Sequence, residues 1–467
     1  DLLYFMGKKL LTVAMIFASI GIQADIITKD EITPDNLYNF GGSMTEYIDP
    51  QVEYSKPPKG FKPFYMSHYG RHGSRYLLNT SQYEDPYNTL KEAYDKGVLT
   101  EFGKSVMDRL EIMKNDADGR LGDLTPKGQR QHRGIANRMV RNYPEIFNNK
   151  AHITARSTTS HRVVASMTAA MMEFSALLPK MEIDFNDSDY DRHYMNTEDP
   201  AISSYKNSRE RNEAVSAFNA AHTNSERLMC ALFTDTTFIT RYAYKAPVMR
   251  FPFMPAGTQQ PATGATSIQD RSDALYNQIY EVAANMQSHD LGIDLNDVFT
   301  YNEWYDMFTT NNVYWYSVSA YSPLTGEIVP YGRASLLQDI LDKANDVIAN
   351  GGTNAHLRYG HDTALFPLLC LMEVNDCEWS VSDLERVADK WVAYDIVHMG
   401  SNLQLIFFKD KKGTILVRAL LNEKEATLPV EPYIDSKGRT HKYFYEWNRV
   451  SAYYQDRIES LKQKIAE

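Results

Sequence analysis

Two arginines flank one histidine in the segment Arg71-His72-Gly73-Ser74-Arg75, which directly follows a stretch with strand character. Guanidinium groups form forked, charge-assisted hydrogen bonds to phosphate oxygens. Gly73 lets the backbone approach a ligand closely, and the imidazole of His72 is placed for in-line attack at phosphorus. The segment predicts a site for a tetrahedral dianion. Taken alone, it could also be a solvated basic turn.

Two further segments offer matching chemistry. Arg162 lies at the start of an expected helix, where free N–H groups and the helix dipole favour an anion, although a surface or salt-bridged role is the alternative for this residue by itself. His361 and Asp362 follow a third short strand. Asp362 could donate a proton to a leaving oxygen, and His361 could hydrogen-bond to the transferring group. An isolated His-Asp pair is weak evidence by itself.

The elements around these residues alternate between strand and helix. We expect strands at 64–68, 152–155 and 357–359, helices at 125–142, 159–178, 335–349 and 450–466, and a hairpin of 404–408 with 414–419. This order predicts an α/β fold with a mainly parallel sheet flanked by helices. Because ligands collect at the carboxyl ends of parallel strands, the three segments should line one pocket.

The length of 467 residues allows this core to be divided by an insertion. Residues 184–331 show short helical patterns interrupted by loops, most clearly at 252–266, and we interpret them as an inserted, mostly α-helical cap subdomain. The predicted core then comprises 25–183 and 332–467.

The composition restricts the partners. With 49 Lys and Arg against 60 Asp and Glu, the net charge is −11, which disfavours nucleic-acid binding through bulk charge. A small anionic ligand must therefore be held by a local cluster of cations. Nothing in the sequence resembles a zinc site.

The N-terminal segment has the order of a secretory leader. Basic residues at 7–9 precede an apolar run at 10–21, with a plausible cleavage point after Ala24. A signal peptide at 1–24 predicts a secreted or periplasmic protein with no membrane span after cleavage. A buried helix or a retained anchor is the alternative, although the run is shorter than the roughly 20 residues that a span needs. Asp1–Phe5 precede Met6 and could lie upstream of the true start.

Three cysteines are too few for a disulfide framework. Cys370 and Cys377 could pair in an oxidising compartment, but Cys370 lies in an apolar run and is better explained as a small buried hydrophobe.

These motifs together resemble the histidine acid phosphatases, the branch of the histidine phosphatase superfamily that includes phytases and multiple inositol polyphosphate phosphatases. The likeness covers about 64–178 and 355–423: the Arg-His-Gly-x-Arg signature at 71–75, the Arg-Ser-Thr-x-x-x-Arg stretch ending at Arg162, and His361-Asp362. Leu124-Thr125-x-x-Gly128-x-x-Gln131-His132 resembles a family helix, and 420–423 resembles the C-terminal hairpin.

The resemblance implies a catalytic role for His72 as the nucleophile that forms a phosphohistidine, and for Asp362 as the donor to the leaving alcohol. It implies that the phosphoryl group is held by Arg71, Arg75, Arg162 and His361. It also implies that no metal and no cofactor is needed, because the arginines supply the positive charge. An acidic optimum is expected, because Asp362 must be protonated when the phosphoryl group transfers.

Two departures from the family pattern stand out. Leu77 occupies a position that is usually proline, and Asp362-Thr363 stands where the inositol polyphosphate phosphatases usually have Ala-Glu. The first should mainly affect turn stiffness. The second leaves the phosphatase prediction intact and puts the inositol phosphate substrate in doubt.

Phytate or another inositol polyphosphate is the favoured substrate, and Lys56, Lys59 and Lys62 are candidate contacts for its outlying phosphates, unless they belong to a solvated loop. The near alternative is a broad-specificity acid phosphatase acting on sugar phosphates or nucleotides. A non-catalytic phosphate- or glycan-binding protein, with the 31 tyrosines as a stacking surface, is a different class of function, and a phosphoryl mutase is disfavoured by the leader.

Overall fold

The computed structural model describes residues 27–245 and 266–466. The predicted leader at 1–24 and nearly all of the loop predicted at 252–266 lie outside these residues. In the part that is described, no helix has both the length and the apolar character required to cross a membrane.

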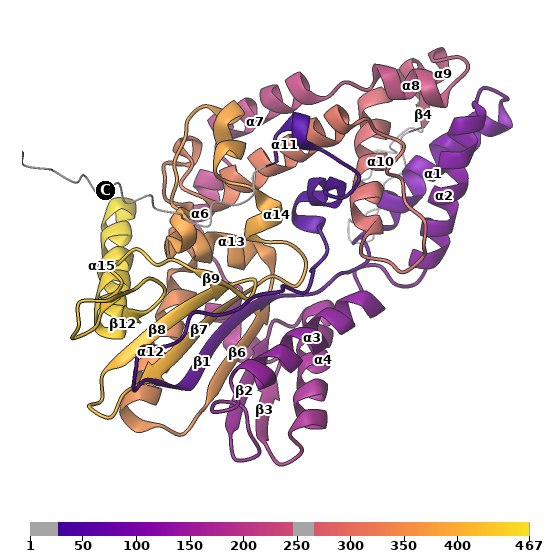
Figure 1. The fold of residues 1–467 in the computed structure, drawn as a ribbon. Coiled ribbons are helices and arrows are strands. Elements are labelled where there is room, and N and C mark those ends of the chain that lie inside the picture. The colour runs from indigo at the N-terminus through magenta and orange to yellow at the C-terminus, as the bar shows by residue number, and fades with distance from the viewer. Residues whose placement is uncertain (1–26, 246–265, 467) are drawn as a thin grey trace, which may run out of the picture.

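A mixed sheet forms the centre of the molecule (Figure 1). Its strands run in the order β12-β8-β7-β1-β6-β2-β3, with β9 added beside β8. The bounds are β1 Lys62–Arg71, β2 His152–Ser157, β3 Glu182–Asn186, β6 Ala355–Gly360, β7 Asn402–Lys409, β8 Ile415–Leu421, β9 Lys424–Ala426 and β12 Tyr445–Glu446. The predicted strands and the hairpin of β7 with β8 are confirmed. β3 was not predicted, and its outward-facing side chains explain why its pattern is weak.

The parallel part of the sheet is β1, β6, β2 and β3, and β7, β8 and β12 complete it with antiparallel pairs. Arg71 at the end of β1 is in register with Gly360 at the end of β6, and Ser157 at the end of β2 pairs with Tyr359. Three strand ends therefore meet at one edge, as the sequence predicts.

Helices cover both faces of this sheet. α3 (Pro126–Asn142) and α4 (His161–Leu177) pack with β2 and β6 in one apolar cluster. α12 (Ala334–Asn350), α13 (Asp362–Leu371) and α15 (Trp447–Ala466) contribute to a second cluster on the sheet. The Thr125 hydroxyl caps α3 by accepting the N–H of Gly128, and Pro126 occupies the first helical position, so both predicted start signals are confirmed.

The helical region beside the sheet is not built from the predicted insertion alone. α1 (Thr80–Asp95) and α2 (Glu101–Ala117) belong to the assigned core segment, yet they share one apolar cluster with α8 (Glu226–Leu232), α10 (Ser272–Met286) and α11 (Tyr301–Ser319), and Figure 1 shows α1, α2, α8 and α10 together. β3 also crosses the expected boundary at 183/184. This arrangement is hard to predict from the order of the elements. The chain passes from β1 to the helical region, where it forms α1 and α2, and comes back to the sheet at α3.

The remaining elements are short or peripheral. The helices are α5 Arg192–Met195, α6 Pro200–Lys206, α7 Arg209–His222, α9 Thr237–Thr240 and α14 Ala393–Ile396, and the strands are β4 Tyr242–Lys245, β5 Thr266–Gln269, β10 Tyr433–Ile434 and β11 Thr440–His441.

Candidate active site

Six of the predicted residues come together where β1, β2 and β6 end. We call this set the cradle: Arg71, His72, Arg75, Arg162, His361 and Asp362. Arg71 closes β1, Arg162 lies in the first turn of α4, and Asp362 opens α13 directly after β6. Asp362 is close enough to shift the pKa of each of the three arginines, and the three arginines shift the pKa of His72. The sheet register thus gathers segments that are nearly 300 residues apart in the chain.

His72 is held as a neutral imidazole with one defined tautomer. Its side chain is buried, and Nδ1 lies 2.9 Å from the carbonyl oxygen of Gly73. A carbonyl only accepts, so Nδ1 carries the proton and Nε2 keeps its lone pair. Burial and the charges of Arg71, Arg75 and other cradle cations lower the pKa of His72 well below its ordinary value. The ring therefore remains an unprotonated nucleophile at acidic pH.

The three arginines present more positive charge than the protein neutralises. Arg71 forms an ion pair with Asp362 at 2.6 Å and donates to the Ser43 carbonyl, yet its Nε has no hydrogen-bond partner. The buried Nε atoms of Arg75 and Arg162 also have none. Burial lowers the pKa of Arg71 to about 10, although Asp362 opposes that shift. Buried donors without acceptors are costly, and an anion with several oxygens would satisfy them.

His361 and Asp362 complete the cradle on the β6 side. The ring of His361 lies 5.7 Å from that of His72, and its Nε2 is 3.1 Å from the hydroxyl of Thr158. Burial and Arg162 lower the pKa of His361 to about 4. Burial by itself would raise the pKa of Asp362, but Arg71, His361 and Arg75 outweigh burial and lower it. In the free protein Asp362 is therefore an ionised partner of Arg71.

Several residues support the loop that bears His72, a role that the sequence had not given them. Gln131 accepts the N–H of Ser74 and donates to its hydroxyl, and Ser166 accepts the N–H of Gly73. A Cβ on Gly73 would lie 2.7 Å from the Gly128 carbonyl oxygen, so glycine is required for this close approach. The resemblance marks Gly128 and Gln131, but only the structure shows that they fix the loop that bears His72. Thr158 belongs to the Arg-Ser-Thr-x-x-x-Arg stretch, but the sequence did not show its contact with His361.

The structure explains why position 77 is leucine although the family usually has proline there. Its side chain is fully buried, and its backbone N–H donates to the Tyr83 hydroxyl at 2.8 Å. Proline has no N–H, so this contact is available only to the residue found here.

For Lys59 and Lys62 the predicted substrate contacts do not fit the structure. Lys62 begins β1 and Arg71 ends it, which separates the two by about 30 Å at the usual rise of an extended strand. Lys59 lies three residues before Lys62, at the same end of the strand. Lys59 and Lys62 are therefore too far away to contact a substrate held in the cradle. Lys56 follows Ser55, which forms hydrogen bonds with Arg418 and Glu425 beside β8 and β9, and its contact with substrate stays a prediction.

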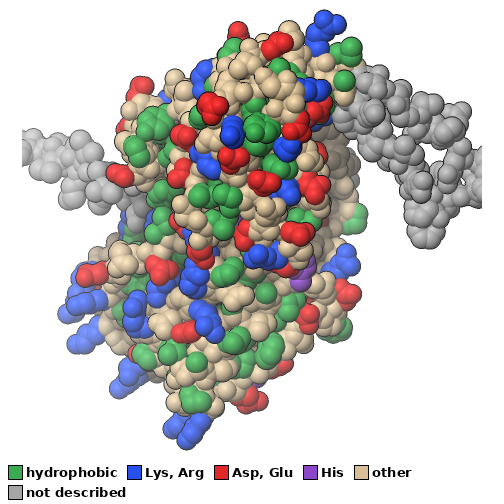
Figure 2. Space-filling model, turned by 90° about the vertical axis from the view of Figure 1, so that its right-hand side faces the viewer, with side chains coloured by type: hydrophobic (Ala, Val, Ile, Leu, Met, Phe, Trp, Pro, Cys, Tyr) green, Lys and Arg blue, Asp and Glu red, His purple; other side chains and the backbone are tan. Residues whose placement is uncertain are grey.

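The positive charge of the cradle does not continue as a uniformly basic surface on the face drawn in Figure 2. On the face drawn in Figure 2, acidic and basic side chains are interspersed over the upper part, whereas Lys and Arg gather at the lower left. Within the described residues, no group of three or more His, Cys, Asp or Glu side chains is arranged to hold a metal. Cys370 is buried in the apolar cluster that contains α13, as expected, and its thiol is not joined to Cys377.

The model of the histidine phosphatase superfamily (branch 2) matches residues 70–422, a range that contains the whole cradle. The chain belongs to this superfamily. This histidine phosphatase is thus an enzyme of a family that acts on small phosphate esters, as the signature segments predicted. Among curated proteins no sequence matches it.

Solved structures share the fold of this histidine phosphatase. The multiple inositol polyphosphate phosphatase of Bifidobacterium longum, in complex with phosphate, has a TM-score of 0.71 at 18% identity and covers 89% of this chain and 97% of its own. The same protein in complex with inositol hexasulfate gives 0.69. The phytase from D. castellii has a TM-score of 0.57 at 13% identity, covering 94% and 92%. At these identities the likeness establishes the histidine-phosphatase fold.

Proposed function

We propose that this enzyme hydrolyses phosphomonoesters through a phosphohistidine at His72 and that inositol polyphosphates such as phytate are its favoured substrates. The observation that carries the proposal is the neutral His72, whose Nδ1 proton is fixed on the Gly73 carbonyl, among three arginines with unsatisfied donors. A phosphate dianion would satisfy those donors and lie against Nε2. The fold shared with an inositol polyphosphate phosphatase supports the substrate class.

The first step forms the Nε2–P bond and breaks the P–O ester bond. Arg71, Arg75 and Arg162 stabilise the charge that is spread over the transferring oxygens. Asp362 gives its proton to the leaving alcohol, which departs neutral. In the second step water attacks phosphorus, its proton passes to the Asp362 carboxylate, and the electrons of the N–P bond return to Nε2. Phosphate is released with both residues restored.

The ion pair between Arg71 and Asp362 sets the protonation requirement. In the free protein this pair contributes to the low pKa of Asp362, which keeps the carboxyl group ionised and without a proton to donate. A bound phosphate dianion competes for Arg71 and places negative charge beside the carboxyl group, and both effects raise its pKa. Substrate binding therefore promotes protonation of the donor, and turnover should be favoured at acidic pH.

The predicted leader at 1–24 supports export of the enzyme to a secreted or periplasmic location, and N-terminal sequencing of the exported protein tests this. The alternative activity is a broad-specificity acid phosphatase. It is favoured by Asp362-Thr363 in place of Ala-Glu.

The test is phosphate release from phytate, sugar phosphates, nucleotides and p-nitrophenyl phosphate across pH, with His72→Ala beside the wild type. We expect phytate to give the highest kcat/KM and His72→Ala to abolish release from every substrate, whereas His441→Ala, remote in the β11 hairpin, retains activity. Peptide mass spectrometry of protein denatured during turnover should locate phosphate on His72. Full activity of His72→Ala contradicts the mechanism, and equal rates on all esters contradict the substrate class.

A further inference from the structure

A cavity of about 210 Å³ adjoins the cradle at His361. One wall is the turn between β2 and α4, including Ser157, Thr158 and Ser160, and the other is the segment around α5, including Arg192. The hydrogen bond between Thr158 and His361 makes that turn common to the cradle and the cavity. Any group bound in the cavity is therefore a neighbour of the group bound in the cradle.

The walls of this cavity contain donors that the protein leaves unused. The Ser157 side chain is 1% exposed and its Oγ has no hydrogen-bond partner. Ser160 precedes α4 without capping it, so the N-terminal N–H groups of this helix lack a side-chain acceptor. Across residues 27–245 and 266–466, no ion pair involves Arg192. Its neighbour Arg156, in contrast, is paired with Asp184 at 2.7 Å and with Asp191 at 3.6 Å.

A cation beside unused hydroxyl and N–H donors fits an anion with several oxygens. Asp189 is the one carboxylate of the cavity wall, and it forms no ion pair with Arg192 in the described structure. A lone inorganic phosphate is already accommodated by the cradle, so an anion in the adjoining cavity would belong to a substrate with more than one phosphate.

We propose that this cavity, the Arg192 subsite, binds a second phosphate of the substrate while the first lies in the cradle. The proposal rests on the function given above and names the residue that selects polyphosphorylated esters. It takes the place of the contacts predicted for Lys59 and Lys62, which lie at the far end of β1. Arg192 thus acts in specificity, and the chemical step remains with the cradle.

Arg192→Ala tests this through the ratio of kcat/KM for phytate to kcat/KM for p-nitrophenyl phosphate. The ratio should fall about 10-fold or more, which corresponds to the loss of one charge-assisted hydrogen bond, and the loss should be mainly in KM. Arg192→Lys keeps the charge and should recover part of the ratio. Lys59→Ala removes an exposed cation far from the cradle and should leave the ratio unchanged. A ratio that does not change in Arg192→Ala overturns the proposal.

Binding measurements separate this proposal from the proposed substrate. The Kd for inositol hexasulfate should rise about 10-fold in Arg192→Ala, whereas the Kd for inorganic phosphate should stay within about 2-fold. Equal weakening of both ligands would show that Arg192 supports the cradle and would overturn the subsite. If the wild type does not hydrolyse phytate, the proposed substrate fails, and the two Kd values still decide whether the subsite exists.

Discussion

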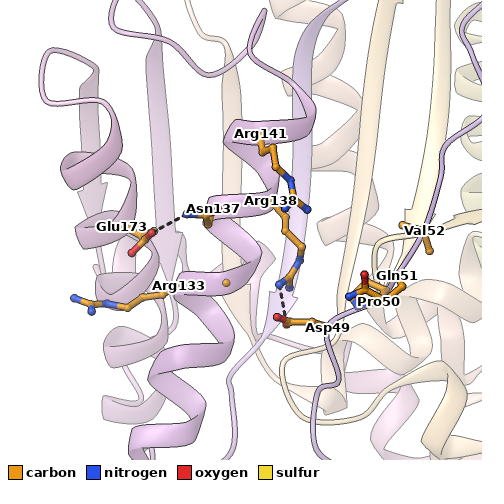
Figure 3. A pocket seen from close by; sticks show the side chains of 10 residues that line it. Asp49, Pro50, Gln51, Val52, Arg133, Asn137, Arg138, Arg141 and Glu173 are labelled. Atoms are coloured by element: carbon orange, nitrogen blue, oxygen red, sulfur yellow. Dashed lines mark hydrogen bonds and ion pairs between the residues drawn. The ribbon is translucent and has the colours of Figure 1, made fainter.

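Arg71 and Arg138 are both buried arginines, but their surroundings differ. Every nitrogen of the Arg138 guanidinium on α3 is bound. Nε and one terminal nitrogen donate to Glu423 at 2.8 and 2.7 Å. The other terminal nitrogen pairs with Asp49 at 2.7 Å, a contact that Figure 3 shows. Burial opposes its charge, yet Glu423 outweighs burial and raises the pKa of Arg138. In the cradle, by contrast, three guanidiniums share one carboxylate, and their Nε atoms are unpartnered.

This difference separates an arginine that stabilises the fold from arginines reserved for a ligand. Because two carboxylates occupy the donors of the Arg138 guanidinium, no donor there is left to bind another anion. A surplus of buried positive charge in the cradle is unfavourable until an anion arrives. The unsatisfied donors are thus a better indicator of function than burial or charge alone.

The largest effect is expected at Asp362, the one carboxylate in the cradle. Asp362→Asn cannot donate a proton to the leaving oxygen, so kcat on alkyl phosphates such as glycerol 2-phosphate should fall about 10²- to 10⁴-fold. On p-nitrophenyl phosphate the loss should be much smaller, because an activated leaving group needs less protonation. Steady-state kinetics with both esters measures the contrast. Equal losses on the two esters contradict the donor role.

The pH profile gives an independent check on Asp362. In the free protein its pKa lies below the ordinary value, and a bound dianion raises it. The alkaline limb of kcat should therefore lie at higher pH than the limb of kcat/KM, and activity should decline as pH rises through the Asp362 pKa. Because the pKa of His72 is well below its ordinary value, protonation of the nucleophile should limit activity only well below the pH range in which histidine ordinarily titrates. Asp362→Asn should flatten the alkaline limb, and an unaltered limb would assign it to another group.

Arg138→Ala should act on stability. It leaves Glu423, which is 2% exposed, without its cation, and breaking such a buried pair costs about 3 to 5 kcal/mol of the free energy of unfolding. Urea unfolding measures this loss, while kcat/KM of the folded fraction should remain near that of the wild type. If the variant does not fold, the double variant Arg138→Met with Glu423→Gln removes both charges and should regain stability. A large loss of kcat/KM in the folded double variant would contradict the structural role.

Arg75→Ala should lower activity without lowering stability, the opposite of the result expected for Arg138→Ala. Loss of one preorganised donor to the transferring phosphoryl group lowers kcat/KM about 10²- to 10³-fold. Because its buried Nε has no partner and its positive charge is only partly balanced, the free energy of unfolding should stay constant or rise. Chemical unfolding and kinetics on the same preparation measure both quantities. Comparable destabilisation of Arg75→Ala and Arg138→Ala would remove the distinction between the two regions.

The sequence predicted the sheet core and the cradle because both have strong local signals. Hydrophobic periodicity and turn residues indicate the strand stretches that end at Arg71 and Gly360. They also indicate the helix starts at Thr125 and Ser160. The resemblance then named the roles of the cradle residues. Nothing local shows that three strand ends are level, since that depends on register between distant segments.

The predictions from the sequence were wrong or incomplete where contacts between distant segments determine the structure. The association of α1 and α2 with α10 joins residues nearly 200 positions apart, and no periodicity records it. Lys59 and Lys62 were assigned as contacts for outlying phosphates from their charge, although β1 begins at Lys62 and separates both from Arg71 at its other end. Arg192 has no motif around it. Arg192 is proposed as a substrate contact because it lines a cavity and forms no ion pair in the described residues, and only the three-dimensional structure shows these two features.

The smallest effect is expected at Leu77, which adjoins the cradle without belonging to it. Leu77→Pro removes the N–H that Tyr83 accepts, so the free energy of unfolding should fall by about 1 to 3 kcal/mol, whereas kcat/KM for p-nitrophenyl phosphate should change less than about 2-fold. Tyr83→Phe removes the same hydrogen bond without proline and should reproduce most of the stability loss. If Leu77→Pro lowers kcat/KM as strongly as Arg75→Ala, the turn after Arg75 positions the reacting groups, and the cradle must be extended to include it.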